Sequence, residues 1–356
     1  MDSFETFPEQ EEAKRLLRAA LADGPAHAYL FYGPLGVGKR RAALVFAGEL
    51  LDAPERVARR AHPDLYVLEP LGDQIRIDPV RDLRRDLHMR PFEAARRVYL
   101  VFGAHVMNED AADALLKDLE EPPAYATIVL VADELGSIPE TIRSRCQLVP
   151  FRRLSQRAVK AYLAARGVSG ETLDVQARVA GGRLDRADRL LEPKAGERRN
   201  RLLELARSVY LDDGFDPARA AEAVGAIARE RGSAARRAVE EAATGEETSR
   251  ELEQRARRAA RGAERDDVLD ALELLSGWYR DLFVVAAGAE GAVLNSDRLG
   301  QLETDASERG RAAEMAAETV RDVWRSFEFN VQTGLALEAL FVRLRRALHG
   351  AQAAGR

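Results

Sequence analysis

Eight consecutive residues, Gly33–Arg40, have the spacing of a loop that binds phosphate groups. The run GPLGVGKR fits the pattern G-x-x-x-x-G-K-[ST] except at its last position. In such a loop the backbone N–H groups and the lysine bind phosphates, and the hydroxyl of the last residue binds Mg²⁺. Lys39 can contact a phosphate, but Arg40 has only N–H donors and cannot be a metal ligand. The candidate nucleotide-contacting residues are Gly33, Gly36, Gly38 and Lys39.

Magnesium-dependent hydrolysis also needs an acidic residue at the end of a neighbouring buried strand. The apolar strand predicted over Val98–Phe102 is followed by Gly103, and no carboxylate stands at its end. Glu109 and Asp110 come several residues later, on the next predicted helix. With both metal-binding features missing, we predict no bound metal and no hydrolysis by this chain. An empty loop and a loop that binds ATP or ADP without hydrolysis are both compatible with the sequence.

A second candidate for chemistry is the triplet Ser144-Arg145-Cys146, which follows a predicted buried strand. An arginine on a loop at the rim of a nucleotide-binding domain can reach a neighbouring subunit's phosphate and stabilise its transition state. From spacing alone a surface arginine is the simpler interpretation, because all but five of the 54 Lys and Arg residues are arginine. Cys146 beside a strand is expected to be a buried small residue rather than a nucleophile. His62, before Pro63-Asp64, is expected to stabilise a turn rather than bind a metal.

The elements around these residues alternate between apolar strands and amphipathic helices, which predicts an α/β domain with a parallel sheet. Each predicted strand is short and apolar, and each helix has apolar residues on one face. The glycine loop lies between a strand and a helix, as its motif requires. The predicted strands are His27–Tyr32, Leu65–Leu68, Val98–Phe102, Thr127–Ala132 and Gln147–Phe151, and the helices Pro8–Asp23, Lys39–Leu51, Val80–Leu87 and Asn108–Glu120.

Beyond residue 151 strand signals nearly vanish and helical patterns take over. We predict an α/β domain over 1–153, a small helical domain over 154–194 and a larger helical domain over 195–356. The segment 234–263 is highly charged and predicts a long exposed helix or a helical hairpin. The predicted helices are Ser155–Arg166, Glu171–Ala180, Leu184–Leu191, Val268–Ala287 and Val323–Leu348.

Composition excludes several classes of protein. A net charge of −5 argues against a protein that grips nucleic acid through bulk positive charge. A single cysteine rules out an intrachain disulfide and a multi-cysteine zinc site. No signal peptide or apolar run long enough for a membrane span is visible, so we expect a cytoplasmic protein without a membrane partner.

Several stretches together resemble the δ′ subunits of bacterial DNA polymerase III clamp loaders. The resemblance covers the α/β domain and continues more loosely to Trp278–Asp281, Asn330 and Leu335–Leu340. It implies an AAA+ P-loop domain, a helical lid and a helical collar within a five-subunit ring. The implied partners are γ/τ and δ subunits, the sliding clamp and primed DNA. The stretches are His27–Phe31 before the glycine loop, His62-Pro63-Asp64, Ala114–Pro123 (ALLKDLEEPP) and Ser144-Arg145-Cys146.

The resemblance also implies roles for individual residues. Arg145 corresponds to the arginine that a non-hydrolysing δ′ subunit offers to the ATP site of the adjacent γ/τ subunit. Arg186 is similar to the sensor-2 arginine, although a surface role on the lid is an equal alternative. The four-cysteine zinc module of many members is missing, so we expect no zinc. Arg40, Phe102 and Gly103 favour δ′ over an active γ/τ-type ATPase. That ATPase and a direct DNA-binding protein are the alternatives.

Overall fold

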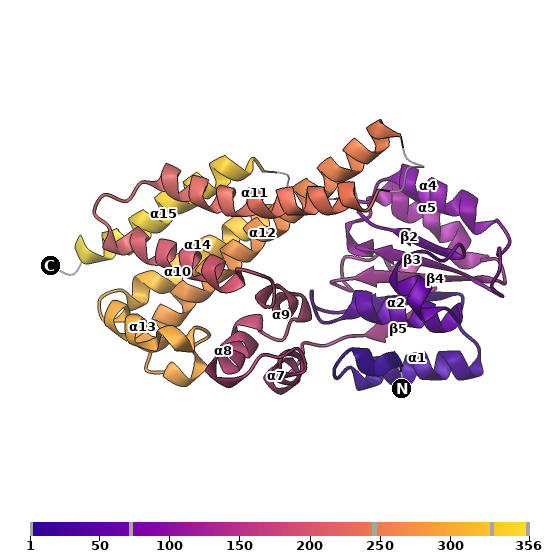
Figure 1. Ribbon diagram of the computed structural model, residues 1–356, viewed down its shortest axis with the longest axis horizontal. Coiled ribbons are helices and arrows are strands. Elements are labelled where there is room, and N and C mark those ends of the chain that lie inside the picture. Colours follow the sequence, from indigo (N-terminus) through magenta and orange to yellow (C-terminus); the bar gives the residue numbers. More distant parts are fainter. Residues whose placement is uncertain (1–2, 71–73, 244–247, 328–330, 354–356) are drawn as a thin grey trace. The chain divides into compact units, whose positions relative to one another are not determined.

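The computed structural model describes residues 3–70, 74–243, 248–327 and 331–353. It divides the chain into two compact units, Met1–Arg189 and Leu190–Arg356 (Figure 1). The first unit contains the α/β domain and nearly all of the segment 154–194. The division of this unit at residue 153 stays a prediction. No helix among the described residues is both long and apolar enough to cross a membrane.

The first unit is built around a parallel five-stranded sheet with the strand order β2-β3-β4-β1-β5. The predicted α/β class is therefore confirmed. Strands β3 and β4 are buried along their whole length, as expected where helices cover both faces of a parallel sheet. Because all strands run the same way, the loops that follow them meet at one edge of the sheet. The strands are β1 Ala28–Tyr32, β2 Leu65–Leu68, β3 Arg97–Phe102, β4 Ala126–Ala132 and β5 Gln147–Pro150.

Helices cover both faces of this sheet (Figure 1). On one face α1 and α2 bury Leu17 and Phe46 against inward side chains of the strands. On the other face α4 and α5 bury Leu83 and Leu115. Asn108 caps α5 by accepting a hydrogen bond from the Ala111 N–H, which fixes where that helix begins. The helices are α1 Glu11–Asp23, α2 Lys39–Leu50, α3 Pro54–Ala58, α4 Ile77–Leu87, α5 Glu109–Glu120 and α6 Glu140–Arg143, with the 3-10 turns Ser3–Thr6 and Ala104–Val106.

Three short helices follow the sheet, in the places that the sequence predicts. They are α7 Gln156–Ala164, α8 Gly170–Ala180 and α9 Leu184–Leu190. The hydroxyl of Ser155 caps α7 by accepting from the Ala158 N–H. Gly181, in the left-handed conformation, ends α8, and the chain turns at once into α9. This turn matters for the glycine loop, because it brings the start of α9 against it.

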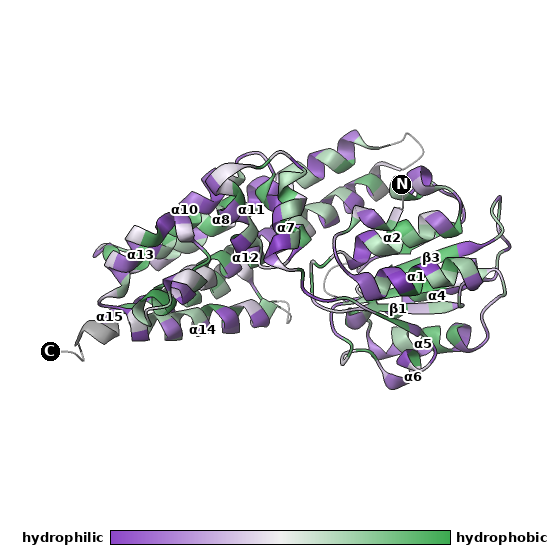
Figure 2. Cartoon of the chain, turned by 90° about the horizontal axis from the view of Figure 1, so that it is seen from below, coloured by the Kyte–Doolittle hydropathy of each residue, from purple (hydrophilic) through white to green (hydrophobic). Residues whose placement is uncertain are grey.

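The second unit is a helical domain with a single core to which most of its helices contribute. Figure 2 shows α14 as alternating purple and green bands, the pattern of an amphipathic helix with one apolar face. Trp278 and Tyr279 are fully buried near the C-terminal end of α12. The helices are α10 Ala195–Leu211, α11 Pro217–Glu241, α12 Ser249–Ala286, α13 Leu299–Ala306, α14 Gly310–Ser326 and α15 Thr333–Ala353, with the 3-10 turns Glu290–Ala292 and Ser296–Arg298.

The structure corrects one predicted helix and refines another. The single helix predicted over Val323–Leu348 is wrong, because α14 ends at Ser326 and α15 begins at Thr333. Turning back lets both helices bury apolar residues in the same core, which one straight helix of that length could not do. Asn330 lies outside the described residues. The charged segment 234–263 is shared between α11 and α12, which pack against each other. Residues 244–247 of this segment lie outside the described residues.

Candidate functional site

The glycine loop joins the carboxyl end of β1 to the start of α2, and its glycines are needed for its shape. Gly33, Gly36 and Gly38 have φ angles of 140°, 77° and 100°, a region that other residues rarely adopt. A Cβ atom on Gly33 would lie 2.1 Å from the Phe151 carbonyl oxygen, so a side chain does not fit there. Gly38 stands directly before the first turn of α2. These backbone angles are compatible with a phosphate-binding loop, and the binding of phosphate here stays a prediction.

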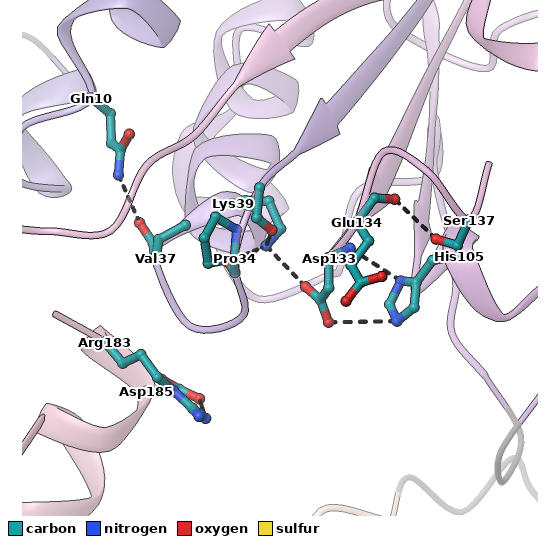
Figure 3. Close-up of polar contacts among 11 residues, drawn as sticks. Gln10, Pro34, Val37, Lys39, His105, Asp133, Glu134, Ser137, Arg183 and Asp185 are labelled. Atoms are coloured by element: carbon teal, nitrogen blue, oxygen red, sulfur yellow. Dashed lines mark hydrogen bonds and ion pairs between the residues drawn. The ribbon is translucent and has the colours of Figure 1, made fainter. Parts of the chain in front are cut away.

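The lysine of the loop already uses its donors within the protein (Figure 3). The Lys39 Nζ donates to the carbonyl oxygens of Gly33 and Pro34, each at 2.6 Å. It also lies 2.9 Å from Asp133 Oδ1. The side chain is 4% exposed, and burial lowers the Lys39 pKa while Asp133 acts against that shift. A lysine ammonium has three N–H donors, so these three contacts satisfy Lys39 completely.

Asp133 is the acidic residue of this site, and the sequence analysis did not identify it. It follows β4 directly, and β4 pairs with β1, so Asp133 reaches the same sheet edge as the glycine loop. Its backbone N–H donates to His105 Nδ1 at 3.2 Å, and its Oδ2 lies 3.5 Å from His105 Nε2. These contacts require that Nδ1 is unprotonated and place the imidazole proton on Nε2, facing the carboxylate. The signal available in the sequence was an acid immediately after a buried strand.

The two departures from the ATPase pattern, Arg40 and Phe102, contact each other. The guanidinium carbon of Arg40 lies 4.4 Å from the centroid of the Phe102 ring. Arg40 Nη2 lies 3.1 Å from Glu69 Oε1, just beyond β2, and Glu69 also binds Arg60. Phe102 is fully buried at the end of β3. A cation stacked on an aromatic ring thus stands at the two sequence positions where a magnesium-dependent ATPase has a hydroxyl and a carboxylate.

The start of α9 closes against the glycine loop. The Leu184 N–H donates to the Gly36 carbonyl at 2.7 Å. A Cβ atom on Gly36 would lie 1.9 Å from Asp185 Oδ1, so the Asp185 carboxyl packs directly on this glycine. Arg183 donates to both Asp185 oxygens, at 3.1 and 2.7 Å. Burial alone would raise the Asp185 pKa, but Arg183 holds it below its usual value.

Arg186, the residue that resembles sensor 2, lies on α9 with its guanidinium beside Gly181. Its pKa is lowered by burial and then by the nearby charge of Arg183. The side-chain atoms nearest to Gly36 belong instead to Asp185 and Arg183. The sensor-2 role of Arg186 stays a prediction, and the structure adds Leu184 and Asp185 as residues of this helix that contact the loop.

Arg145 lies at the other end of the sheet from Lys39. It precedes β5, in which Gln147 pairs with Tyr29 at the start of β1 and Pro150 pairs with Tyr32 at its end. The glycine loop follows Tyr32, so the length of β5 separates the two sites, about 13 Å for its four residues. The side chain of Arg145 is 34% exposed. The structure therefore brings Lys39, Asp133, Arg40 and Asp185 together and keeps Arg145 apart.

Cys146 is half-buried, where the sequence analysis expects a buried residue, and His62 is buried in a turn. Cys146 packs against the sheet core, and burial raises the pKa of its thiol to about 12. The thiol is protonated at neutral pH and is a poor nucleophile. His62 Nδ1 accepts from the Asp64 N–H at 3.1 Å, and the buried Asp64 carboxylate accepts from three backbone N–H groups over residues 92–94. Among the described residues, no three His, Cys, Asp or Glu side chains are grouped to hold a metal ion.

Known proteins with similar sequences are subunits of one replication enzyme. A family model described as DNA polymerase III, delta subunit, matches residues 9–155. The delta' subunit of DNA polymerase III from Pseudomonas aeruginosa is 40% identical over 136 residues, which cover 34% of this chain and 42% of that protein. Part of the first unit is thus similar in sequence to clamp-loader subunits of the delta' type. The likeness extends to tau subunits, because that of Bacillus subtilis is 32% identical over 170 residues.

The match covers only part of each protein. The delta' subunit of Bacillus subtilis is 32% identical over 168 residues, or 44% of this chain. The chain spans 51% of that protein, 42% of the Pseudomonas delta' subunit and 30% of the Bacillus tau subunit. A gamma subunit-related protein of Thermotoga maritima has a similar structure, with a TM-score of 0.51 at 16% identity over 94% of this chain and 99% of that one. This likeness shows the fold alone, a parallel sheet flanked by helices and followed by a helical C-terminal region.

Proposed function

We propose that this chain is a non-hydrolysing subunit of a DNA polymerase III clamp loader. It supplies Arg145 to the ATP site of a neighbouring tau/gamma-type subunit, in a ring that also contains a delta subunit and loads a sliding clamp onto primed DNA. The observation that carries the proposal is the stacking of Arg40 on Phe102 beside the glycine loop. A cation at the metal position repels Mg²⁺, and neither residue has an oxygen ligand in its side chain.

The position of Arg145 supports a role in trans. It lies at the opposite edge of the sheet from its own glycine loop, about 13 Å away along β5, so it cannot serve a phosphate bound at Lys39. Its guanidinium is partly exposed at the surface of the unit, where another chain can reach it. Arginine is suited to this role because it stays charged and presents several donors to phosphate oxygens.

A working ATPase is the second candidate, and Asp133 is the observation that favours it. Its carboxylate lies at the sheet edge beside Lys39, where an acidic residue is useful for catalysis. Asp133 is already paired with Lys39, however, and the Arg40 guanidinium stacks on Phe102 at the end of the neighbouring strand β3. Binding of ATP or ADP without hydrolysis stays a proposal, and in it the phosphate displaces Asp133 from Lys39.

The experiment compares Arg145→Ala with the matched control Arg143→Ala in the complete assembly. Arg143 is in the same loop region, 30% exposed, and is paired with Glu140 on its own helix. The subunit is reconstituted with the tau/gamma and delta subunits and the clamp of its own organism. Removing an arginine finger lowers the rate of hydrolysis about 10³-fold or more at the ATP site that it serves. Clamp-stimulated ATP turnover of the whole assembly therefore falls by the fraction that this one site contributes. Normal turnover of the Arg145→Ala assembly would overturn the proposal.

A further inference from the structure

The guanidinium of Arg145 is held by a defined set of contacts from three residues. Nη1 donates to the Thr141 carbonyl at 2.8 Å and to Ser144 Oγ at 3.3 Å, and Nη2 binds Glu120 Oε1. Thr141 and Ser144 belong to the same short stretch of chain as Arg145. Glu120 is the last residue of α5, 25 positions earlier. The carboxylate therefore ties the loop of Arg145 to a helix packed on the sheet.

Glu120 is in a position where helix stability does not favour a carboxylate. The end of a helix carries partial negative charge from unpaired carbonyl groups, which repel an acidic side chain in the last turn. Pro122 and Pro123 follow at once and stop the helix, so the last turn of α5 is fixed in place. The ion pair itself adds little stability, because the Glu120 side chain is 50% exposed and that of Arg145 34%. What the pair does is set the direction of the guanidinium.

We infer that Glu120 is a positioning residue that holds Arg145 ready for the phosphate of the neighbouring subunit. The three contacts use three of the five N–H donors of the guanidinium, which leaves two for a bidentate contact with phosphate oxygens. The carboxylate also balances the charge of Arg145 while no phosphate is present. This inference rests on the proposed function of Arg145 and adds the residue that aims it.

The test measures ATP turnover of the reconstituted assembly with four variants of this chain. They are Glu120→Ala, Glu120→Gln, Glu121→Ala and Arg145→Ala. Glu121 is the matched control because it is the adjacent carboxylate at the end of α5, is exposed, and has no contact with Arg145 in the structure. Glutamine keeps an oxygen that accepts the bond from Nη2, so Glu120→Gln separates the role of the bond from that of the charge.

We expect Glu120→Ala to lose most of the turnover that Arg145→Ala removes, because a misplacement of about 1 Å can cost about 10²-fold at a catalytic site. The loss is in kcat, with KM for ATP within about twofold, because the arginine acts on the transition state. Glu120→Gln keeps most of the activity and Glu121→Ala keeps all of it. In the Arg145→Ala background, Glu120→Ala has no further effect.

The outcomes separate the two proposals. If Arg145→Ala lowers turnover and Glu120→Ala does not, the positioning role is wrong and the proposed function stands. If Glu120→Ala raises turnover, the carboxylate restrains the arginine instead of aiming it, and the inference is overturned. If Arg145→Ala itself has no effect, the proposed function fails, and the inference fails with it.

Discussion

Replacing Asp133 by asparagine removes the counter-charge of a buried lysine without changing the size of the side chain. Lys39 is 4% exposed and keeps its two carbonyl contacts, but it loses an ionic partner at 2.9 Å. Breaking a fully buried ion pair from one side costs about 3–5 kcal/mol. Asp133 is 29% exposed, so water screens part of the interaction, and we expect a loss of about 2 kcal/mol in the free energy of unfolding.

The assay exploits the placement of the tryptophans. Trp278 and Trp324 are both in the second unit, so tryptophan fluorescence follows that unit, whereas far-UV circular dichroism follows both. In Asp133→Asn the circular-dichroism transition of the first unit moves down by about 4–8 °C, at about 2–4 °C per kcal/mol for a unit of this size. The fluorescence transition stays where it is in the unmodified protein.

Two further variants decide whether the buried charge is the cause. Glu134→Gln removes the neighbouring exposed carboxylate and is expected to have little effect on stability. Lys39→Met combined with Asp133→Asn removes the stranded cation and recovers part of the loss. The reasoning is refuted if Asp133→Asn is no more destabilising than Glu134→Gln, because Lys39 would then not depend on its ion pair.

Two other predictions concern buried titratable groups of the first unit. Burial raises the Cys146 pKa to about 12, so little reactive thiolate is present at pH 8. Alkylation of Cys146 by iodoacetamide, followed by mass spectrometry, should therefore be slower in the folded protein than in urea by a factor of about 10² or more. Equal rates would contradict this prediction. Burial alone would raise the Asp64 pKa, but three backbone N–H groups hold it below its usual value. The stabilisation from these bonds is therefore present above that usual value and is lost as pH falls through the folded-state pKa. Asp64→Asn should therefore lower the free energy of unfolding, measured with urea, by about 2–4 kcal/mol at pH 7. This difference between the variant and the unmodified protein should shrink below about pH 4, and a difference independent of pH would contradict the prediction.

Much of the first unit could be predicted from the sequence because its elements have strong local signals. The strand Leu65–Leu68 has the predicted bounds, and the other strands agree to within one residue at each end. Buried parallel strands are continuous apolar runs, and glycines and prolines mark their ends. The glycine loop was equally visible, since its motif fixes both its residues and its neighbours.

The contacts that define the site could not be predicted in the same way, because they depend on strand order. The sequence pointed to the end of β3 as the place for an acid, but the acid beside Lys39 follows β4, which pairs with β1. Asp185 approaches Gly36 through the turn from α8 into α9, which no local pattern reveals. The break between α14 and α15 was missed for a related reason, because it depends on the packing of both helices into one core. The local signal at Gly334 is weak.

The most direct test of the central claim is ATP hydrolysis by the purified chain, alone and with its partners. We predict no magnesium-dependent turnover by the isolated chain, either unmodified or as Arg40→Thr, because the end of β3 still lacks a carboxylate. The same preparation should support Arg145-dependent turnover when tau/gamma and delta subunits are added. Hydrolysis by the isolated chain that is lost in Lys39→Ala would contradict the account and show that this glycine loop belongs to a working ATPase.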